Sequence, residues 1–122
     1  MSLQAIGQIA VTARDLARAT SFYRDTLGIP HLFTAGTMAF FDCGPVRLLV
    51  GLADRPEFEP PGSVLYFRTP DIAAAHADLA AKGVAFEAEP HLVARMPDHE
   101  LWLAFFRDTE GNLLALMSEV RS

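Results

Sequence analysis

Two apolar runs near the end of the chain, residues 101–106 and 113–117, give the strongest hydrophobic pattern in the sequence. The segment between them, RDTEGN at residues 107–112, is polar and rich in turn-forming residues, so the three together predict a β-hairpin. Both runs are apolar at nearly every position, which is typical of strands covered on both faces. We therefore expect helices against one face of this hairpin. A second sheet, a partner chain or a ligand should cover the other.

The first half of the chain shows the pattern of a strand, a helix and three further strands. Asp15 is placed to cap the helix, and Gly28 with Pro30 ends it. Apolar residues recur at helical spacing between these limits, which supports a helix that packs on one side. The predicted strands are residues 6–12, 31–33, 38–42 and 46–52, and the predicted helix is 15–27.

The same order returns in the second half. Asp71 follows Pro70 at the start of a helix that Gly83 closes. The predicted strands are residues 64–69, 84–87 and the two strands of the hairpin, and residues 89–98 are predicted as an inserted loop. The halves align with an offset of 56 at the front, where Asp15 matches Asp71, and of 67 at the back, where Gly44 matches Gly111.

This duplication predicts a single α+β domain, residues 1–122, made of two repeats. The repeats cover about residues 4–53 and 63–120, and the stretch between them, residues 54–62, contains three prolines and is predicted as a linker.

Four segments, QIAVTARDL, SFYRDTLG, TPDIAAAHADLAAKGV and FFRDTEGNLLAL, occur in an order that resembles the vicinal oxygen chelate superfamily. This superfamily includes glyoxalases, bleomycin-resistance proteins and extradiol dioxygenases. The resemblance covers essentially the whole chain. It implies paired βαβββ modules that curl round a cleft, usually in a homodimer.

Strand alternation predicts which side chains face such a cleft, because the helix-facing side should be more apolar. Ile9 and Val11 fit the helix side and leave Gln8, Ala10 and Thr12 for the cleft. In the second copy, Leu65 and Phe67 fit the helix side and leave Val64, Tyr66 and Arg68. The repeat then assigns to the cleft Val46, Leu48 and Val50, and Leu113, Ala115 and Met117. The resemblance adds His99, Leu101, Leu103 and Phe105.

Metal-dependent members of the superfamily carry ligands at positions that correspond here to Gln8, Leu48, Val64 and Ala115. Only Gln8 could coordinate an ion, and one neutral amide oxygen cannot hold Zn, Ni or Fe(II) against water. The sequence therefore predicts no metal at these positions and no bound cofactor. Within the resemblance, this favours the bleomycin-resistance branch, whose members sequester a drug in the cleft of a dimer, and the acidic balance would tolerate a cationic ligand.

Candidate ligand-binding residues combine polar groups with apolar walls. Arg68 could bind a carboxylate or phosphate bidentately, or could pair with Glu87. His99 is the leading catalytic candidate, because histidine transfers protons near neutral pH. The full candidate set is Gln8, Tyr66, Arg68, His91, His99, Glu100, Leu103, Phe105, Ala115 and Met117.

Composition limits the classes of partner. The net charge is −5 and there is no basic run, which disfavours nucleic acid. No apolar stretch approaches the roughly 20 residues of a membrane span. A single cysteine and an N-terminus without signal-peptide character predict a cytoplasmic protein.

Three hypotheses remain. The first is a small-molecule-binding homodimer without the standard metal. The second is a lyase, isomerase or dioxygenase whose divalent metal is held by relocated ligands, namely His91, His99, Glu100 and Gln8. The third is a dimeric interaction module whose open sheet face serves assembly.

Overall fold

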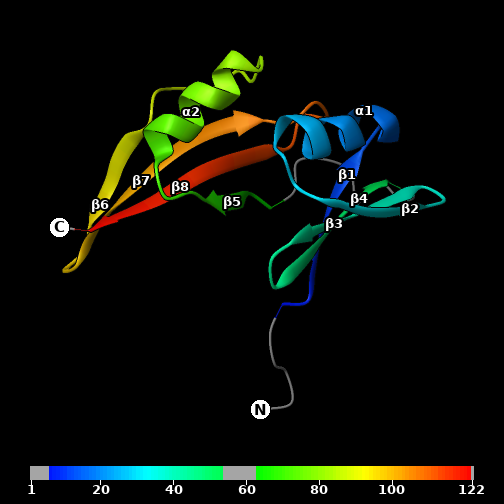
Figure 1. Cartoon of the computed structure of the whole chain (residues 1–122), viewed down its shortest axis with the longest axis horizontal. Coiled ribbons are helices and arrows are strands. Elements are labelled where there is room, and N and C mark those ends of the chain that lie inside the picture. Colours follow the sequence, from blue (N-terminus) through cyan, green and yellow to red (C-terminus); the bar gives the residue numbers. More distant parts are fainter. Residues whose placement is uncertain (1–5, 54–62, 122) are drawn as a thin grey trace, which may run out of the picture. The chain divides into compact units, whose positions relative to one another are not determined.

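The computed structural model describes residues 6–53 and 63–121. The chain forms two compact units, which divide between residues 62 and 63. Each unit has a four-stranded sheet with helix against one face (Figure 1). The predicted α+β fold of paired βαβββ modules is therefore confirmed. The predicted linker, residues 54–62, lies outside the described residues, and no helix among those described is long and apolar enough to span a membrane.

The first unit contains β1 (Gln8–Ala13), α1 (Leu16–Ser21), a π-helical turn η1 (Phe22–Thr26), β2 (His31–Ala35), β3 (Met38–Cys43) and β4 (Val46–Leu52). The sheet order is β1-β4-β3-β2, with β1 parallel to β4. Asp15 caps α1 as predicted, since its carboxylate accepts a hydrogen bond from the Arg18 backbone N–H at 3.0 Å. The buried face of the sheet packs against the helical segment through Tyr23 and Phe41, whose ring centroids lie 5.9 Å apart.

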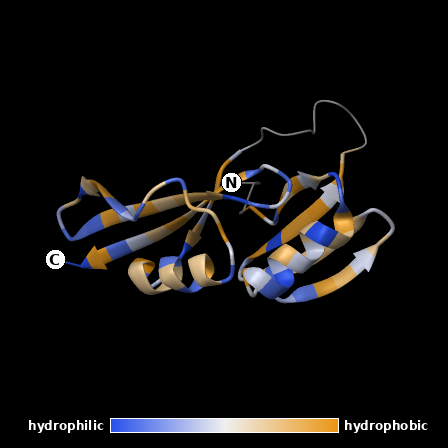
Figure 2. Cartoon of the chain, turned by 90° about the horizontal axis from the view of Figure 1, so that it is seen from above, coloured by the Kyte–Doolittle hydropathy of each residue, from blue (hydrophilic) through white to orange (hydrophobic). Residues whose placement is uncertain are grey.

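The second unit repeats this topology with β5 (Leu65–Arg68), α2 (Ile72–Ala81), β6 (His91–Arg95), β7 (His99–Arg107) and β8 (Leu113–Arg121). The sheet order is β5-β8-β7-β6, with β5 parallel to β8. Asp71 caps α2 by accepting from the Ala74 N–H at 3.1 Å. The core under α2 includes Phe106 and Leu114, and Figure 2 shows α2 itself as mostly hydrophobic, as its alanine-rich sequence requires.

One predicted strand of the second unit is wrong. Residues 84–87 contribute only an isolated bridge between Phe86 and Phe106, and the strand that completes the sheet is β6, inside the segment predicted as a loop. Pro90 and Pro97 bound this five-residue strand, which pairs antiparallel with β7. The hairpin strands β7 and β8 also extend beyond the predicted apolar runs, because pairing continues through polar residues as far as His99 and Arg121.

The turn between β7 and β8 is held by Asp108, which is buried. Its carboxylate accepts hydrogen bonds of 2.8 Å from the backbone N–H groups of Glu110 and Asn112 and from the Asn112 side-chain amide. Gly111 completes the turn with a φ of 87°, a conformation that favours glycine. These residues shape the hairpin that carries the candidate site.

Candidate functional site

The face of the second sheet opposite α2, here called the second open face, carries most of the predicted ligand-binding residues. Strand pairing sets Tyr66 and Phe105 on either side of Ala115, and sets Leu103 beside Met117. Directly paired residues project to the same face of a sheet. The predicted orientation of these side chains is therefore confirmed.

Aromatic rings line this face. The ring centroids of Tyr66 and Phe105 lie 6.1 Å apart in an edge-to-face arrangement, and those of His91 and Phe105 lie 6.4 Å apart. The small Ala115 between them is fully buried, whereas Tyr66 is 49% exposed. This arrangement provides an apolar floor with accessible rings, which suits contact with a flat or apolar ligand.

Arg68 lies on the same face, opposite Met117 at the end of β5. It is exposed and forms no ion pair with another residue in the described part of the chain. The alternative prediction that it pairs with Glu87 is wrong, because Glu87 pairs with Arg107 at 3.2 Å. The guanidinium of Arg68 is thus placed to receive an anionic group.

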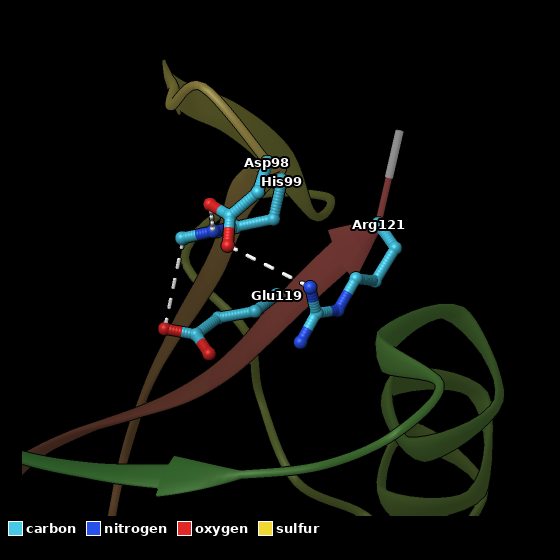
Figure 3. Close-up of polar contacts among 4 residues, drawn as sticks. All are labelled: Asp98, His99, Glu119 and Arg121. Atoms are coloured by element: carbon cyan, nitrogen blue, oxygen red, sulfur yellow. Dashed lines mark hydrogen bonds and ion pairs between the residues drawn. The ribbon is translucent and has the colours of Figure 1, made fainter.

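His99 belongs to a polar cluster at the far end of β7 and β8 (Figure 3). Its Nδ1 lies 2.8 Å from the Asp98 carboxylate, and its Nε2 lies 3.7 Å from Glu119. Arg121 approaches the other oxygen of Asp98 at 3.6 Å. The hydrogen bond with His99 lowers the pKa of Asp98 below its usual value. His99 is six positions along β7 from Phe105, so the cluster and the aromatic floor occupy different parts of the strand.

The relocated metal site is not assembled. Glu100 lies on the face opposite His99, where its carboxylate accepts hydrogen bonds from Arg95 and from the Trp102 indole N–H. His91 pairs with Leu103, four residues along β7 from His99. Among the residues that the structure describes, no three His, Cys, Asp or Glu side chains are grouped so as to hold a metal ion.

The first sheet also has a face opposite its helix, here called the first open face, and one prediction for it is wrong. Leu48 and Val50 pair with Ile9 and Val11, and both are buried on the helix side. The physical reason is turn length. Two residues connect β3 to β4, whereas five connect β7 to β8, so the two turns differ by an odd number of residues. Successive residues of a strand point to opposite faces, so aligning Gly44 with Gly111 at an offset of 67 assigned every residue of β4 to the wrong face.

On β4, the residues that lie on the first open face instead are Arg47, Leu49 and Gly51. They share this face with residues of the neighbouring strands that include Gln8, Phe40 and Asp42. Sequence reasoning missed the role of Arg47 although a signal was present. Arg47 is the only charged residue in the run VRLLVGL, and a charged side chain in such a strand should face away from the core.

The structure also revises the comparison with the metal positions of the superfamily. Ala115 pairs with Tyr66, and the equivalent pair in the first unit is Leu49 with Ala10. The four positions therefore carry Gln8, Leu49, Val64 and Ala115, which still offer one oxygen donor. That donor, Gln8 Oε1, accepts a hydrogen bond from Arg47 Nε at 2.9 Å. A guanidinium so close repels a divalent cation, so these residues do not fit a metal.

Two four-stranded sheets of identical topology, each with helix on one face, define the glyoxalase-like fold. The sequence matches the Glyoxalase/Bleomycin resistance protein/Dioxygenase superfamily over residues 5–116. The chain belongs to this family, as its motifs indicated.

Relatives and solved structures agree on the fold. The uncharacterized protein YraH of Bacillus subtilis (strain 168) is 28% identical over an alignment of 127 positions, and the match spans 89% of this chain and 94% of YraH. A lactoylglutathione lyase from Agrobacterium tumefaciens has a TM-score of 0.76 at 25% identity, over 97% of this chain and 96% of that one. TnmS3, an antibiotic binding protein from Streptomyces sp. CB03234, has a TM-score of 0.79 at 24% identity, over 98% of each chain.

Proposed function

We propose that this protein binds a small molecule with an aromatic or apolar body on the second open face, without a metal at the standard positions. The observation that carries the proposal is the pair of rings, Tyr66 and Phe105, over a floor that includes Ala115 and Leu103. Accessible aromatic rings above a buried apolar floor favour a ligand that contributes its own apolar surface. The use of this fold by TnmS3, described as an antibiotic binding protein, is compatible with such a role.

Two further features belong to the same proposal. We expect a homodimer, because the superfamily usually pairs its modules in dimers. We also expect a cytoplasmic location, because the sequence has a single cysteine. Drug sequestration, and hence antibiotic resistance, is one form that the binding could take. The dimer is testable by sedimentation equilibrium, where a molecular mass of one chain at micromolar concentration would contradict it.

The ligand-binding proposal is tested by a thermal shift screen with aromatic compounds of each charge type. Compounds that bind the folded state raise the melting temperature. Each hit is then repeated on Tyr66→Ala, which removes a half-exposed ring, and on Val120→Ala, which removes exposed apolar surface from the opposite face of β8. We expect Tyr66→Ala to weaken binding by about tenfold and Val120→Ala to leave it unchanged. A screen without hits, or hits insensitive to Tyr66, would overturn the proposal.

A further inference from the structure

The first open face carries a guanidinium that is held in place from two sides. Arg47 Nε donates to Gln8 Oε1 at 2.9 Å, and the guanidinium carbon lies 5.3 Å from the centre of the Phe40 ring. Phe40 is stacked in turn on Phe33, with ring centroids 4.6 Å apart and an angle of 25° between the planes. These four side chains, which we call the Arg47 row, come from all four strands of the first sheet.

The contacts of Arg47 leave one edge of the guanidinium available. Nε is occupied by Gln8, while the two terminal nitrogens have no hydrogen bond or ion pair with any residue that the structure describes. These nitrogens form a fork that matches the two oxygens of a carboxylate or the oxygens of a phosphate. Because Gln8 and Phe40 already restrain the side chain, less conformational entropy is lost when an anion binds.

The neighbouring aromatic rings indicate what the anion is attached to. Phe33 is 48% exposed, so the row offers an accessible aromatic surface beside the cation. We propose that the Arg47 row is a subsite for an anionic aromatic molecule, with its carboxylate or phosphate on Arg47 and its ring against Phe40 and Phe33. This inference rests on the proposed small-molecule-binding function, concerns the first unit taken by itself, and adds the charge of a ligand that this face would take.

One acidic group opposes the proposal and provides a test of it. Asp42 pairs with Arg47 across the sheet and faces the same side. Its carboxylate forms no ion pair with Arg47 and instead accepts a hydrogen bond from the Gly44 N–H at 3.2 Å. Asp42 is the only acidic residue on this face within the described strands β1 to β4. Its negative charge should weaken anion binding, and its removal should strengthen it.

The experiment measures binding of benzoate, neutral benzamide and cationic benzylamine to the full chain by isothermal titration, with amide chemical shifts to locate the site. Benzoate should bind best and should shift the amide signals around Arg47 and Phe40. Arg47→Gln should weaken benzoate by at least about tenfold, and Arg47→Lys by less, because a charge remains but the fork is lost. Asp42→Asn, which keeps an acceptor for Gly44, should tighten benzoate about two- to fivefold.

The matched control is Arg18→Gln, which removes the same charge from an exposed position on α1, against the opposite face of the sheet. It should leave benzoate binding unchanged. Equal loss in Arg18→Gln and Arg47→Gln, no benzoate binding to the natural chain, or a preference for benzamide or benzylamine would each overturn the inference. The proposed function is tested separately: hits whose binding does not change in Tyr66→Ala would contradict it and would leave the result for Arg47 unaffected. Titration with inorganic phosphate separates binding of the anion alone from binding that also uses the rings. If phosphate bound as tightly as benzoate, Phe40 and Phe33 would have no part in binding and the inference would be overturned.

Discussion

Asp108 shows how a single buried carboxylate can hold a turn of the candidate site. Its oxygens accept backbone and side-chain hydrogen bonds from Glu110 and Asn112. Removing the carboxylate takes these three hydrogen bonds away from buried groups. We therefore expect Asp108→Ala to lower the free energy of unfolding by about 2–4 kcal/mol, as measured by urea denaturation.

Asp42 provides the control for that measurement. It occupies the corresponding turn of the first unit, but it is exposed, and its carboxylate accepts from the Gly44 N–H at a longer 3.2 Å. Asp42→Ala should lower the free energy of unfolding by less than about 1 kcal/mol. Equal losses in the two variants would show that the hydrogen bonds of Asp108 do not set the stability of its turn.

Asp98 gives a second prediction for a single residue, in this case a pH dependence. Its pKa in the folded chain lies below the usual value because of the hydrogen bond with His99. A lowered folded-state pKa means that the ionised form stabilises the fold above the unfolded-state pKa, and that this contribution disappears as the pH falls through the folded-state pKa. In carboxyl NMR titrations, the Asp98 pKa should rise toward its usual value in His99→Ala. An unchanged Asp98 pKa in that variant would contradict the assigned cause.

The two helices show how far sequence patterns determine an element. Asp15 and Asp71 occupy equivalent positions in the repeats, and both cap their helices as predicted. Replacing either by alanine should lower the free energy of unfolding by about 1 kcal/mol, and replacing it by asparagine should retain most of that stability. Denaturation of the four variants measures both effects. A loss in the asparagine variants as large as in the alanine variants would show that the cap contact is not responsible.

The strands show where sequence patterns fail. Alternation correctly assigned the faces of β1 and β5, because each contains polar residues on one side. Assigning the faces of β4 from those of β8 failed, because the turns that precede the two strands differ by an odd number of residues. Aligning the turn glycines does not show this difference, which moves each side chain to the other face. β6 was missed because its apolar centre is short and its ends, His91 and Arg95, are polar. The segment forms a strand through its pairing with β7. The candidate rings of the second open face were thus predicted, whereas the Arg47 row was missed because the repeat was followed instead of the single charge in β4.

The charge of the whole chain is a poor guide to the charge that its ligand should carry. The net charge of −5 suggested that a cationic ligand would be tolerated. In each unit taken by itself, however, the face opposite the helix presents an exposed arginine, Arg47 in the first and Arg68 in the second. Local fields at a binding surface depend on the nearby groups, because more distant exposed charges are screened beyond about 8–10 Å at ordinary ionic strength. Asp42 faces the same side as Arg47, so the proposed preference for an anionic ligand rests on the unbonded edge of the Arg47 guanidinium and not on the net charge of the face.

The same arginine leads to a prediction about the metal content of the whole protein. With Arg47 bonded to Gln8, and with Leu49, Val64 and Ala115 at the other positions, we expect purified protein to carry far less than one divalent ion per chain by elemental mass spectrometry. Treatment with EDTA should change neither the melting temperature nor the binding of compounds found in the screen, because neither depends on a metal. The variant Gln8→Ala serves as a control and should leave the metal content where it was. Stoichiometric Fe, Ni, Zn, Mn or Co that EDTA removes, together with a fall in melting temperature, would show that the chain builds a metal site from other residues and would reverse the proposal of metal-free binding.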